Sequence, residues 1–259
     1  MIGVRDAARD WPHYLSAGLL VMIRLSGVVA FAPIFSSQSI SPRVKAGFVV
    51  ALACLLAPAV ALLPGARVTL DMSAILGELA VGLVFGFSLT LLTEALDFAG
   101  ALLGMSFSFS LVNLLDPNSH VETALMSQFF NLLSTLIMIA AGLDRTLLSA
   151  VVRSFRAVPV GDAALQATTA ASLAEMAGGI FLAGLQLAAP VLAAALAVEM
   201  TVSMVSRLAP QLPAMVMSIP LKTMTSYAVL VASLAVWPWW IERHFTALLD
   251  AAEHLLVKS

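Results

Sequence analysis

The sequence predicts an all-α membrane protein, with about six long hydrophobic helices in hairpins, short amphipathic helices and a central loop. Two observations support this prediction. Of the 259 residues, 61% are hydrophobic and only 11% are charged, and the mean hydropathy is +1.00, whereas a soluble domain is roughly 25% charged. The apolar residues also fall into about six runs of roughly 20, the length that crosses a hydrocarbon core about 30 Å thick. These runs are expected to be helical, because backbone exposed to lipid must satisfy its own hydrogen bonds.

The first three runs are expected at residues 14–35, 44–63 and 72–103. Proline and glycine mark the joints between them, at 36–42 and 64–71. Arg24 interrupts the first run, so we interpret that run as a retained span rather than a cleaved secretory signal.

The last three runs are expected at 123–143, 173–200 and 223–241, separated by joints at 144–170 and 207–222. No soluble domain of appreciable size is left over. We therefore expect one integral-membrane domain over residues 1–259. The net charge of -2 and the absence of a Lys/Arg cluster argue against nucleic-acid binding.

Two segments have the pattern of an amphipathic helix lying along a membrane surface. The first has its apolar residues on one helical face: Leu147, Leu148, Val151, Val152 and Phe155. The second is the C-terminal tail, 242–259, which follows a tryptophan cluster at 237–240 that fits a headgroup belt.

Glycines four residues apart, at Gly82 and Gly86 and again at Gly100 and Gly104, have the spacing at which two membrane helices approach closely. The same spacing also arises by chance, since glycine is common in membrane helices.

Six charged residues fall inside the apolar runs: Arg24, Glu78, Glu94, Asp97, Glu175 and Glu199. A charge at mid-membrane costs at least about 2.5 kcal/mol unless it is paired or hydrated. A proton or ion pathway is one interpretation. Pairing between helices or subunits is favoured, because most of these residues lie near a predicted helix end. A third possibility is that the helices are surrounded by protein rather than lipid.

No catalytic or metal-binding motif is present, and the four histidines are scattered at ends and joints. Asp116 and Glu122 flank His120, but solvated loop polarity explains this cluster better than acid–base chemistry. The sequence therefore predicts neither an enzyme nor a cofactor.

The central loop, 104–118, reads "GMSFSFSLVNLLDPN" and alternates serine with apolar residues, which is not a helical pattern. No Lys or Arg occurs between residues 99 and 145. From the residues alone, a short connection or re-entrant turn is the simplest interpretation.

Four motifs, in chain order, resemble the FliR family of type III secretion export-gate subunits: "RLSGVVAFAPIFSSQSISPRVKAGFVVALACLLAP" (24–58), "GALLGMSFSFSLVNLLDPNS" (100–119), "RSFRAVPVG" (153–161) and "SRLAPQLPAMVMSIPLK" (206–222). The matching residues are Arg24, Gly27, Pro33, Pro42, Arg43, Pro58, Gly100, Asp116, Pro117, Pro159, Arg207, Pro210, Gln211, Pro220 and Lys222.

The resemblance implies a non-enzymatic subunit of the protein export gate in the bacterial inner membrane, at the flagellar basal body or, in the alternative, in an injectisome. It also implies a pore complex with FliP and FliQ, contacts with FlhB and FlhA, and passage of unfolded export substrates. In such an assembly, apolar runs need not all span lipid. The remaining alternative is a small-molecule or ion transporter, although the two halves of the chain show no convincing repeat.

The resemblance further implies that the central loop is a plug in the pore. Its apolar side chains would block water and ions, its serines would satisfy irregular backbone, and its lack of charge would let substrates pass. The implied plug residues are Gly104, Met105, Ser106, Phe107, Ser108, Phe109, Ser110, Leu111, Val112 and Asn113.

Overall fold

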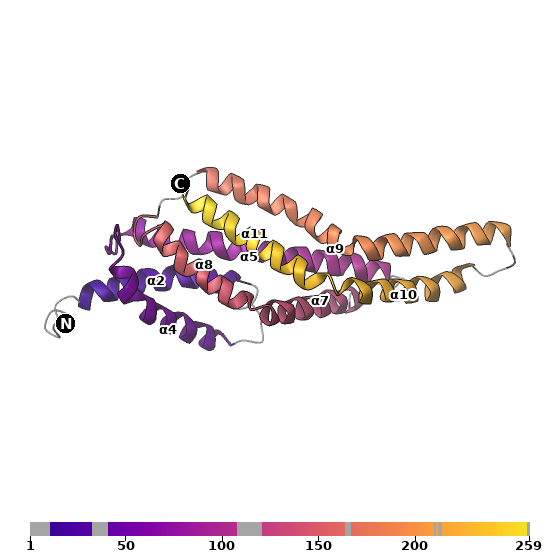
Figure 1. Ribbon diagram of the computed structural model, residues 1–259, viewed down its shortest axis with the longest axis horizontal. Helices are drawn as coiled ribbons and strands as arrows, with labels where there is room; N and C mark the ends of the chain where they lie inside the picture. Colours follow the sequence, from indigo (N-terminus) through magenta and orange to yellow (C-terminus); the bar gives the residue numbers. More distant parts are fainter. Residues whose placement is uncertain are drawn as a thin grey trace. The chain divides into compact units, whose positions relative to one another are not determined.

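The computed structural model describes residues 11–32, 41–107, 121–163, 167–209, 211 and 214–257. Within these ranges every regular element is an α-helix (Figure 1). The helices are α2 (Trp11–Phe31), α4 (Pro42–Ala61), α5 (Met72–Ser106), α7 (Val121–Ala140), α8 (Leu143–Ala157), α9 (Ala167–Leu208), α10 (Ala214–Ser233) and α11 (Trp237–Val257). The predicted all-α fold class is confirmed.

Four of these helices are long and apolar enough to cross a membrane, or up to six spans if each of two bent pairs counts as one. The first bent pair joins α7 to α8 at an angle of 69°. Gly142, with φ +70°, lies at this bend, in a conformation that glycine adopts without strain. The expected total of about six is therefore reached only when α7–α8 and α10–α11 are each counted as one broken span.

The run expected to be continuous over 223–241 is not one helix. It breaks between Ser233 and Trp237, with a bend of 60°. Pro238 lies in the first turn of α11, directly after Trp237. Backbone N–H groups in a first turn have no intrahelical acceptor, so the missing N–H of proline costs no hydrogen bond there. The run was predicted from hydropathy, which does not change across this break.

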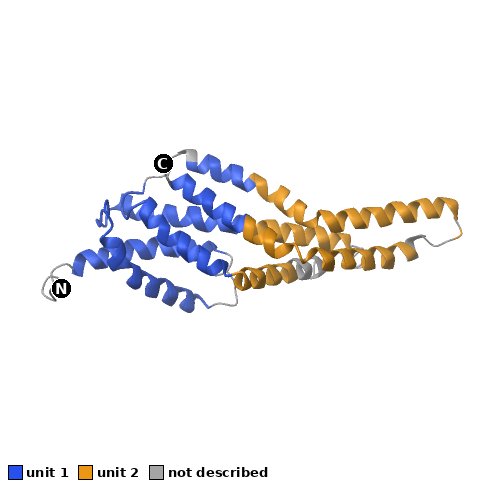
Figure 2. Cartoon of the chain, viewed as in Figure 1, with its two compact units in different colours: residues 1–91, 142–177, 244–259 blue, residues 92–141, 178–243 orange. Residues whose placement is uncertain are grey.

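The described chain divides into two compact units (Figure 2). Unit 1 comprises residues 1–91, 142–177 and 244–259, and unit 2 comprises residues 92–141 and 178–243. Three helices, α5, α9 and α11, contribute residues to both units.

Unit 1 contains α2 packed on α4, the first part of α5, and α8 (Figure 1). Its core includes Leu20, Leu25, Phe85, Phe155 and Phe245, all at most 2% exposed. The segment is confirmed as a helix, α8, but three residues of its predicted membrane-facing side, Leu147, Val151 and Phe155, are buried in the core of unit 1, whereas Val152 is 40% exposed. For these three side chains the protein itself supplies the apolar environment.

Close packing of α2 on α5 depends on glycines in unit 1. A Cβ added at Gly82 would lie 2.3 Å from the carbonyl oxygen of Arg24, and one at Gly86 would lie 2.7 Å from that of Gly27. No side chain fits in these gaps, so the predicted close approach at Gly82 and Gly86 is confirmed. Gly100 and Gly104 are buried in α5, and their role in packing stays a prediction.

Unit 2 contains the second part of α5, α7, most of α9, α10 and the start of α11. The expected headgroup belt is not what Trp237 forms, because its side chain is 1% exposed and its ring packs 5.2 Å from that of Phe130. Trp239 is 58% exposed, and its place in a headgroup belt stays a prediction.

Candidate functional site

Arg24 of α2 and Glu78 of α5 form a buried ion pair in unit 1. Arg24 Nε donates to Glu78 Oε2 at 2.6 Å, and Nη2 donates to Oε1 at 3.1 Å. Two parallel bonds between a guanidinium and a carboxylate are the strong, orientation-specific form of this contact. The charges at these two positions are thus paired between helices, as favoured from the sequence.

Helix α8 and the residue that follows it accept the other hydrogen bonds of the Arg24 guanidinium. Arg24 Nη1 donates to Ser154 Oγ at 3.2 Å, and Nη2 donates to the carbonyl oxygen of Val158 at 3.1 Å. The ring of Phe155 lies 4.3 Å from the guanidinium carbon, within cation–π range. Ser154 Oγ itself donates to the carbonyl oxygen of Val151 at 2.7 Å. The buried face of α8 is therefore arranged around a positive charge.

The turn after α8 supplies a further hydrogen bond to the Glu78 carboxylate. The backbone N–H of Gly161 donates to Glu78 Oε1 at 2.9 Å. Gly161 has φ +79°, and a Cβ there would lie 2.0 Å from the carbonyl oxygen of Arg67. The N–H of Arg67 donates to the carbonyl oxygen of Val160 at 2.8 Å. Only glycine fits both the backbone conformation and the space, so the "VPVG" end of the third motif has a physical reason.

This Arg24–Glu78 network joins α2, α5, α8 and the turn after α8. A buried ion pair is tolerated only where the remaining donors and acceptors are also satisfied. Four hydrogen bonds leave Arg24 for Glu78, Ser154 and Val158. A fixed, fully engaged pair of this kind is suited to holding helices in register. It is poorly suited to carrying an ion, because a carrier group must release its partner.

The described part of the predicted plug lies at the end of α5, in unit 2. Gly104, Met105 and Ser106 belong to the helix, so it extends into the alternating segment, and Phe107 follows in a turn. The Met105 side chain is 64% exposed, whereas that of Phe107 is 2% exposed. The serine Oγ of Ser106 donates to the carbonyl oxygen of Leu102 at 3.1 Å, one turn back, as expected for a serine inside a helix.

Phe107 contacts α10. Its ring stacks on that of Tyr227, with centroids 4.4 Å apart and planes at 15°. Thr223 Oγ1 lies 3.3 Å from the carbonyl oxygen of Phe107, to which it donates. One residue earlier in α10, the ammonium of Lys222 donates to the carboxylate of Glu199 in α9. The end of α5 and the α9–α10 hairpin are thus linked within unit 2.

The other predicted intramembrane charges have varied surroundings. Asp97 Oδ1 accepts from Asn131 Nδ2 of α7 at 3.2 Å. Glu94 on α5 and Glu175 on α9 are exposed. Of the six charges, four contact partners on other helices and two lie at the surface of the described chain.

The remaining motif residues lie in helices and turns of the described chain or outside the described residues. Pro42 begins α4, where proline is favoured, and Pro58 and Pro220 lie inside α4 and α10. Arg207 occupies the last turn of α9. The others described are Gly27 at the α2–α5 contact, Arg43 in α4, Gly100 in α5, Pro159 after α8 and Gln211, which is exposed. Outside the described residues are Pro33, Ser108, Phe109, Ser110, Leu111, Val112, Asn113, Asp116, Pro117 and Pro210.

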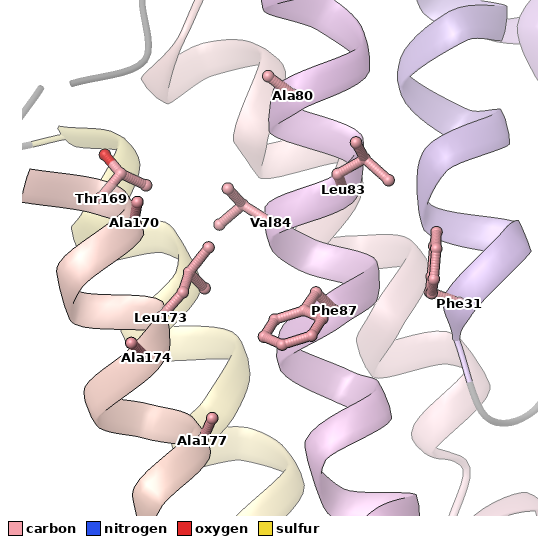
Figure 3. Close-up of a pocket in the computed structure, with 10 residues that line it drawn as sticks. All are labelled: Phe31, Ala80, Leu83, Val84, Phe87, Thr169, Ala170, Leu173, Ala174 and Ala177. Carbon is pink, nitrogen blue, oxygen red and sulfur yellow. The ribbon is translucent and has the colours of Figure 1, made fainter. Parts of the chain in front are cut away.

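An apolar groove of about 540 Å³ lies in unit 1 between α5 and the start of α9 (Figure 3). Figure 3 shows the side chains of Val84 and Leu173 pointing into the space between α5 and α9, and Phe87 of α5 and Phe31 of α2 also belong to the lining. Among the described residues of its lining, Thr169 alone is polar. The described lining residues include no acidic or basic side chain, and the described part of the chain contains no group of three or more potential metal ligands.

Sequence reasoning did not identify Ser154, Gly161, Thr223 or Tyr227 as site residues. Ser154 gave a signal, because it is a polar residue on the apolar face of an amphipathic segment. Thr223 and Tyr227 gave none, since both residue types are common in membrane helices. Their importance depends on which part of α5 they meet.

Comparison with known proteins agrees with the resemblance seen in the motifs. The family model described as "Bacterial export proteins, family 1" matches residues 15–248. Flagellar biosynthetic protein FliR of Escherichia coli (strain K12) is 26% identical over 231 residues, covering 88% of this chain and 87% of that protein. FliR of Pectobacterium carotovorum subsp. carotovorum is 25% identical over 251 residues, 96% of each chain. FliR of Bacillus subtilis (strain 168) is 26% identical over 244 residues, covering 93% of this chain and 94% of that protein.

Proposed function

The chain belongs to the bacterial export proteins, family 1, and from this premise we propose that it is a non-enzymatic subunit of the flagellar type III export gate. In this proposal it forms part of a pore complex with FliP and FliQ in the bacterial inner membrane, at the basal body. It contacts FlhB and FlhA, and unfolded substrates pass through the pore. The observation that carries the proposal is the match of one export family over residues 15–248, with flagellar relatives aligned along nearly the whole chain.

The distribution of surface residues supports assembly. On α9 of unit 2, large apolar side chains are exposed, among them Phe181 at 64%, Met200 at 68% and Met204 at 67%. Glu94 and Glu175 are exposed on equally apolar helices. A carboxylate facing lipid alone is costly, whereas one facing another subunit can meet polar groups there. Surfaces of this mixed kind are expected where helices are covered partly by sister proteins.

The transporter alternative gains no support. Its most central candidate, Arg24, is fully buried and bonded to Glu78, Ser154 and Val158. A carrier residue needs access to its cargo from at least one side. Arg24 has no exposed side-chain surface in unit 1.

Assembly is tested by isolating the tagged full-length protein from native membranes in mild detergent and measuring the intact mass. We expect a complex containing FliP and FliQ, and poor yield when the protein is expressed without them. A folded, stable monomer in its native membrane would overturn the proposal. Small-solute transport by the purified protein alone in liposomes would establish the alternative.

We further propose that the segment 104–118 is the resting plug of this gate. Shortening it between Met105 and Leu111 is expected to raise ion permeability of the cell membrane while export continues. Wild-type permeability in the plug variant would refute this role.

A further inference from the structure

We propose that Tyr227 and Thr223 are positioning residues that hold the end of α5 and so fix where the plug segment begins in the closed gate. This inference rests on the proposed plug function and deepens it. Both residues lie on α10, and both contact Phe107, the last described residue before the plug segment continues. All three belong to unit 2.

The aromatic stack is the stronger of the two contacts. Phe107 follows the last helical residue of α5, yet its side chain is only 2% exposed, so tertiary packing holds it in place. Its ring and that of Tyr227 lie nearly parallel, at 15°, with centroids 4.4 Å apart. Stacked aromatic pairs contribute beyond the area that they bury, and they fix orientation as well as distance.

The hydroxyl of Thr223 adds a weaker tether to the main chain. It has one proton and two acceptors within range, the carbonyl oxygens of Ile219 at 2.8 Å and of Phe107 at 3.3 Å. The final carbonyls of a helix lack intrahelical donors. Thr223 therefore supplies part of a C-terminal cap for α5, from a different helix. Since the bond to Ile219 is shorter, we expect loss of the hydroxyl to matter less than loss of the stack.

Helix α10 is itself held against α9. Lys222, the neighbour of Thr223, pairs with Glu199 of α9. A movement of Phe107 away from Tyr227 and Thr223 requires both the aromatic stack and the hydrogen bond to break.

The test uses the full-length protein in its native gate, with resting ion permeability as the first measurement. Tyr227→Ala is expected to leak more than wild type and less than the variant shortened between Met105 and Leu111. Tyr227→Phe keeps the stack and is expected to stay at the wild-type level. Thr223→Val removes the hydroxyl and is expected to leak slightly more than wild type. Thr223→Ser keeps a hydroxyl and is expected to stay at the wild-type level.

The second measurement separates positioning from general destabilisation. The amide of Phe107 donates to the carbonyl oxygen of Leu103 at 3.1 Å. In the purified complex, hydrogen exchange at this amide is expected to be roughly two- to tenfold faster in Tyr227→Ala, the range that loss of a stack predicts. Phe129→Ala, which removes a 52% exposed aromatic side chain of unit 2, is the matched control and should change neither measurement.

Each outcome decides between the two proposals. If the shortened variant leaks and Tyr227→Ala does not, the positioning role is wrong and the plug role stands. If neither leaks, the plug role itself fails. Equal leakage from Tyr227→Ala and Phe129→Ala would also overturn the positioning role. Should Tyr227→Ala fail to assemble, Tyr227→Leu retains bulk without a ring and is read in the same two assays, with the same expected results.

Discussion

Arg24 and Glu78 lie 54 positions apart in the sequence and form a bidentate ion pair in which neither side chain has any exposed surface. The pair accounts for two of the six charges in the apolar runs, and it joins α2 to α5 at the point where glycines bring these helices close together. The same pair engages Ser154 and the backbone around Gly161. Four segments of unit 1 are therefore held by one contact network, and its members are suitable targets for testing the fold.

Removing one partner of the pair should destabilise the protein strongly. Glu78→Ala leaves the Arg24 guanidinium buried without its counter-ion, a loss of about 3–5 kcal/mol. Arg24→Lys should also destabilise the protein, because an ammonium cannot make both parallel hydrogen bonds to the Glu78 carboxylate. Thermal unfolding of the detergent-solubilised complex, followed by tryptophan fluorescence, measures the loss. Asp250→Asn, which changes an exposed carboxylate of α11 in unit 1, is the control. Equal melting of Glu78→Ala and Asp250→Asn would show that the pair is not structural.

An apolar replacement of both charges should also fail to restore stability. Such replacements are often tolerated in buried pairs. Here, however, the double variant Arg24→Leu with Glu78→Leu leaves the Val158 carbonyl and the Gly161 N–H without the bonds that they make now. We expect roughly 1–3 kcal/mol of lost stability per unsatisfied group. Wild-type melting of the double variant would contradict the network described above.

Gly82→Ala should separate α2 from α5. The added Cβ would lie 2.3 Å from the carbonyl oxygen of Arg24, and backbone cannot swing away as a side chain can. Overpacking of this kind costs about 1–3 kcal/mol. Gly178→Ala, on α9 with open space around its Cβ, is the matched control and should be neutral or stabilising by up to about 1 kcal/mol, because alanine favours helix. The melting temperature of Gly82→Ala should fall, whereas that of Gly178→Ala should stay at the wild-type value or rise; an equal fall in both variants would refute the contact.

Gly161→Ala tests the turn beneath Glu78. Gly161 and Gly142 both have positive φ, +79° and +70°, so both substitutions strain the backbone by about 1 kcal/mol. Only at Gly161 does the Cβ also meet a neighbour, the carbonyl oxygen of Arg67 at 2.0 Å, whereas the space around Gly142 is open. Unfolding measurements should therefore show the larger loss for Gly161→Ala. A larger loss for Gly142→Ala would mean that conformation alone, not contact, determines the cost.

The Lys222–Glu199 pair should contribute little on its own. Glu199 is 49% exposed, so solvent and salt screen the contact, and exposed pairs typically contribute 0–1 kcal/mol. Glu199→Gln is expected to shift the melting temperature only slightly, and less at high salt than at low salt. The swap of Lys222→Glu with Glu199→Lys should restore the wild-type value. A loss comparable with that of Glu78→Ala would show that this pair is desolvated in the complex.

Much of the candidate site could be anticipated from the sequence, and the rest could not. The motifs pointed to Arg24, Gly27 and Lys222, and each now has a described contact. The contact partner of each residue could not be predicted, because nothing in the spacing of Arg24 and Glu78 indicates that they meet. Tyr227 was not predicted for the same reason, since the sequence around an aromatic residue in an apolar helix does not indicate which ring it stacks on.

The sequence by itself determined the class of the protein, because hydropathy and run length are local properties and every apolar run near 20 residues becomes a helix wherever water is excluded. Tertiary structure alone decided where those helices break, which face of α8 is buried and which charges are neutralised. These depend on the meeting of residues far apart in the chain, such as Arg24 with Glu78 and Phe107 with Tyr227. A contact of this kind is stabilised only when the whole unit closes around it, so no local pattern encodes it.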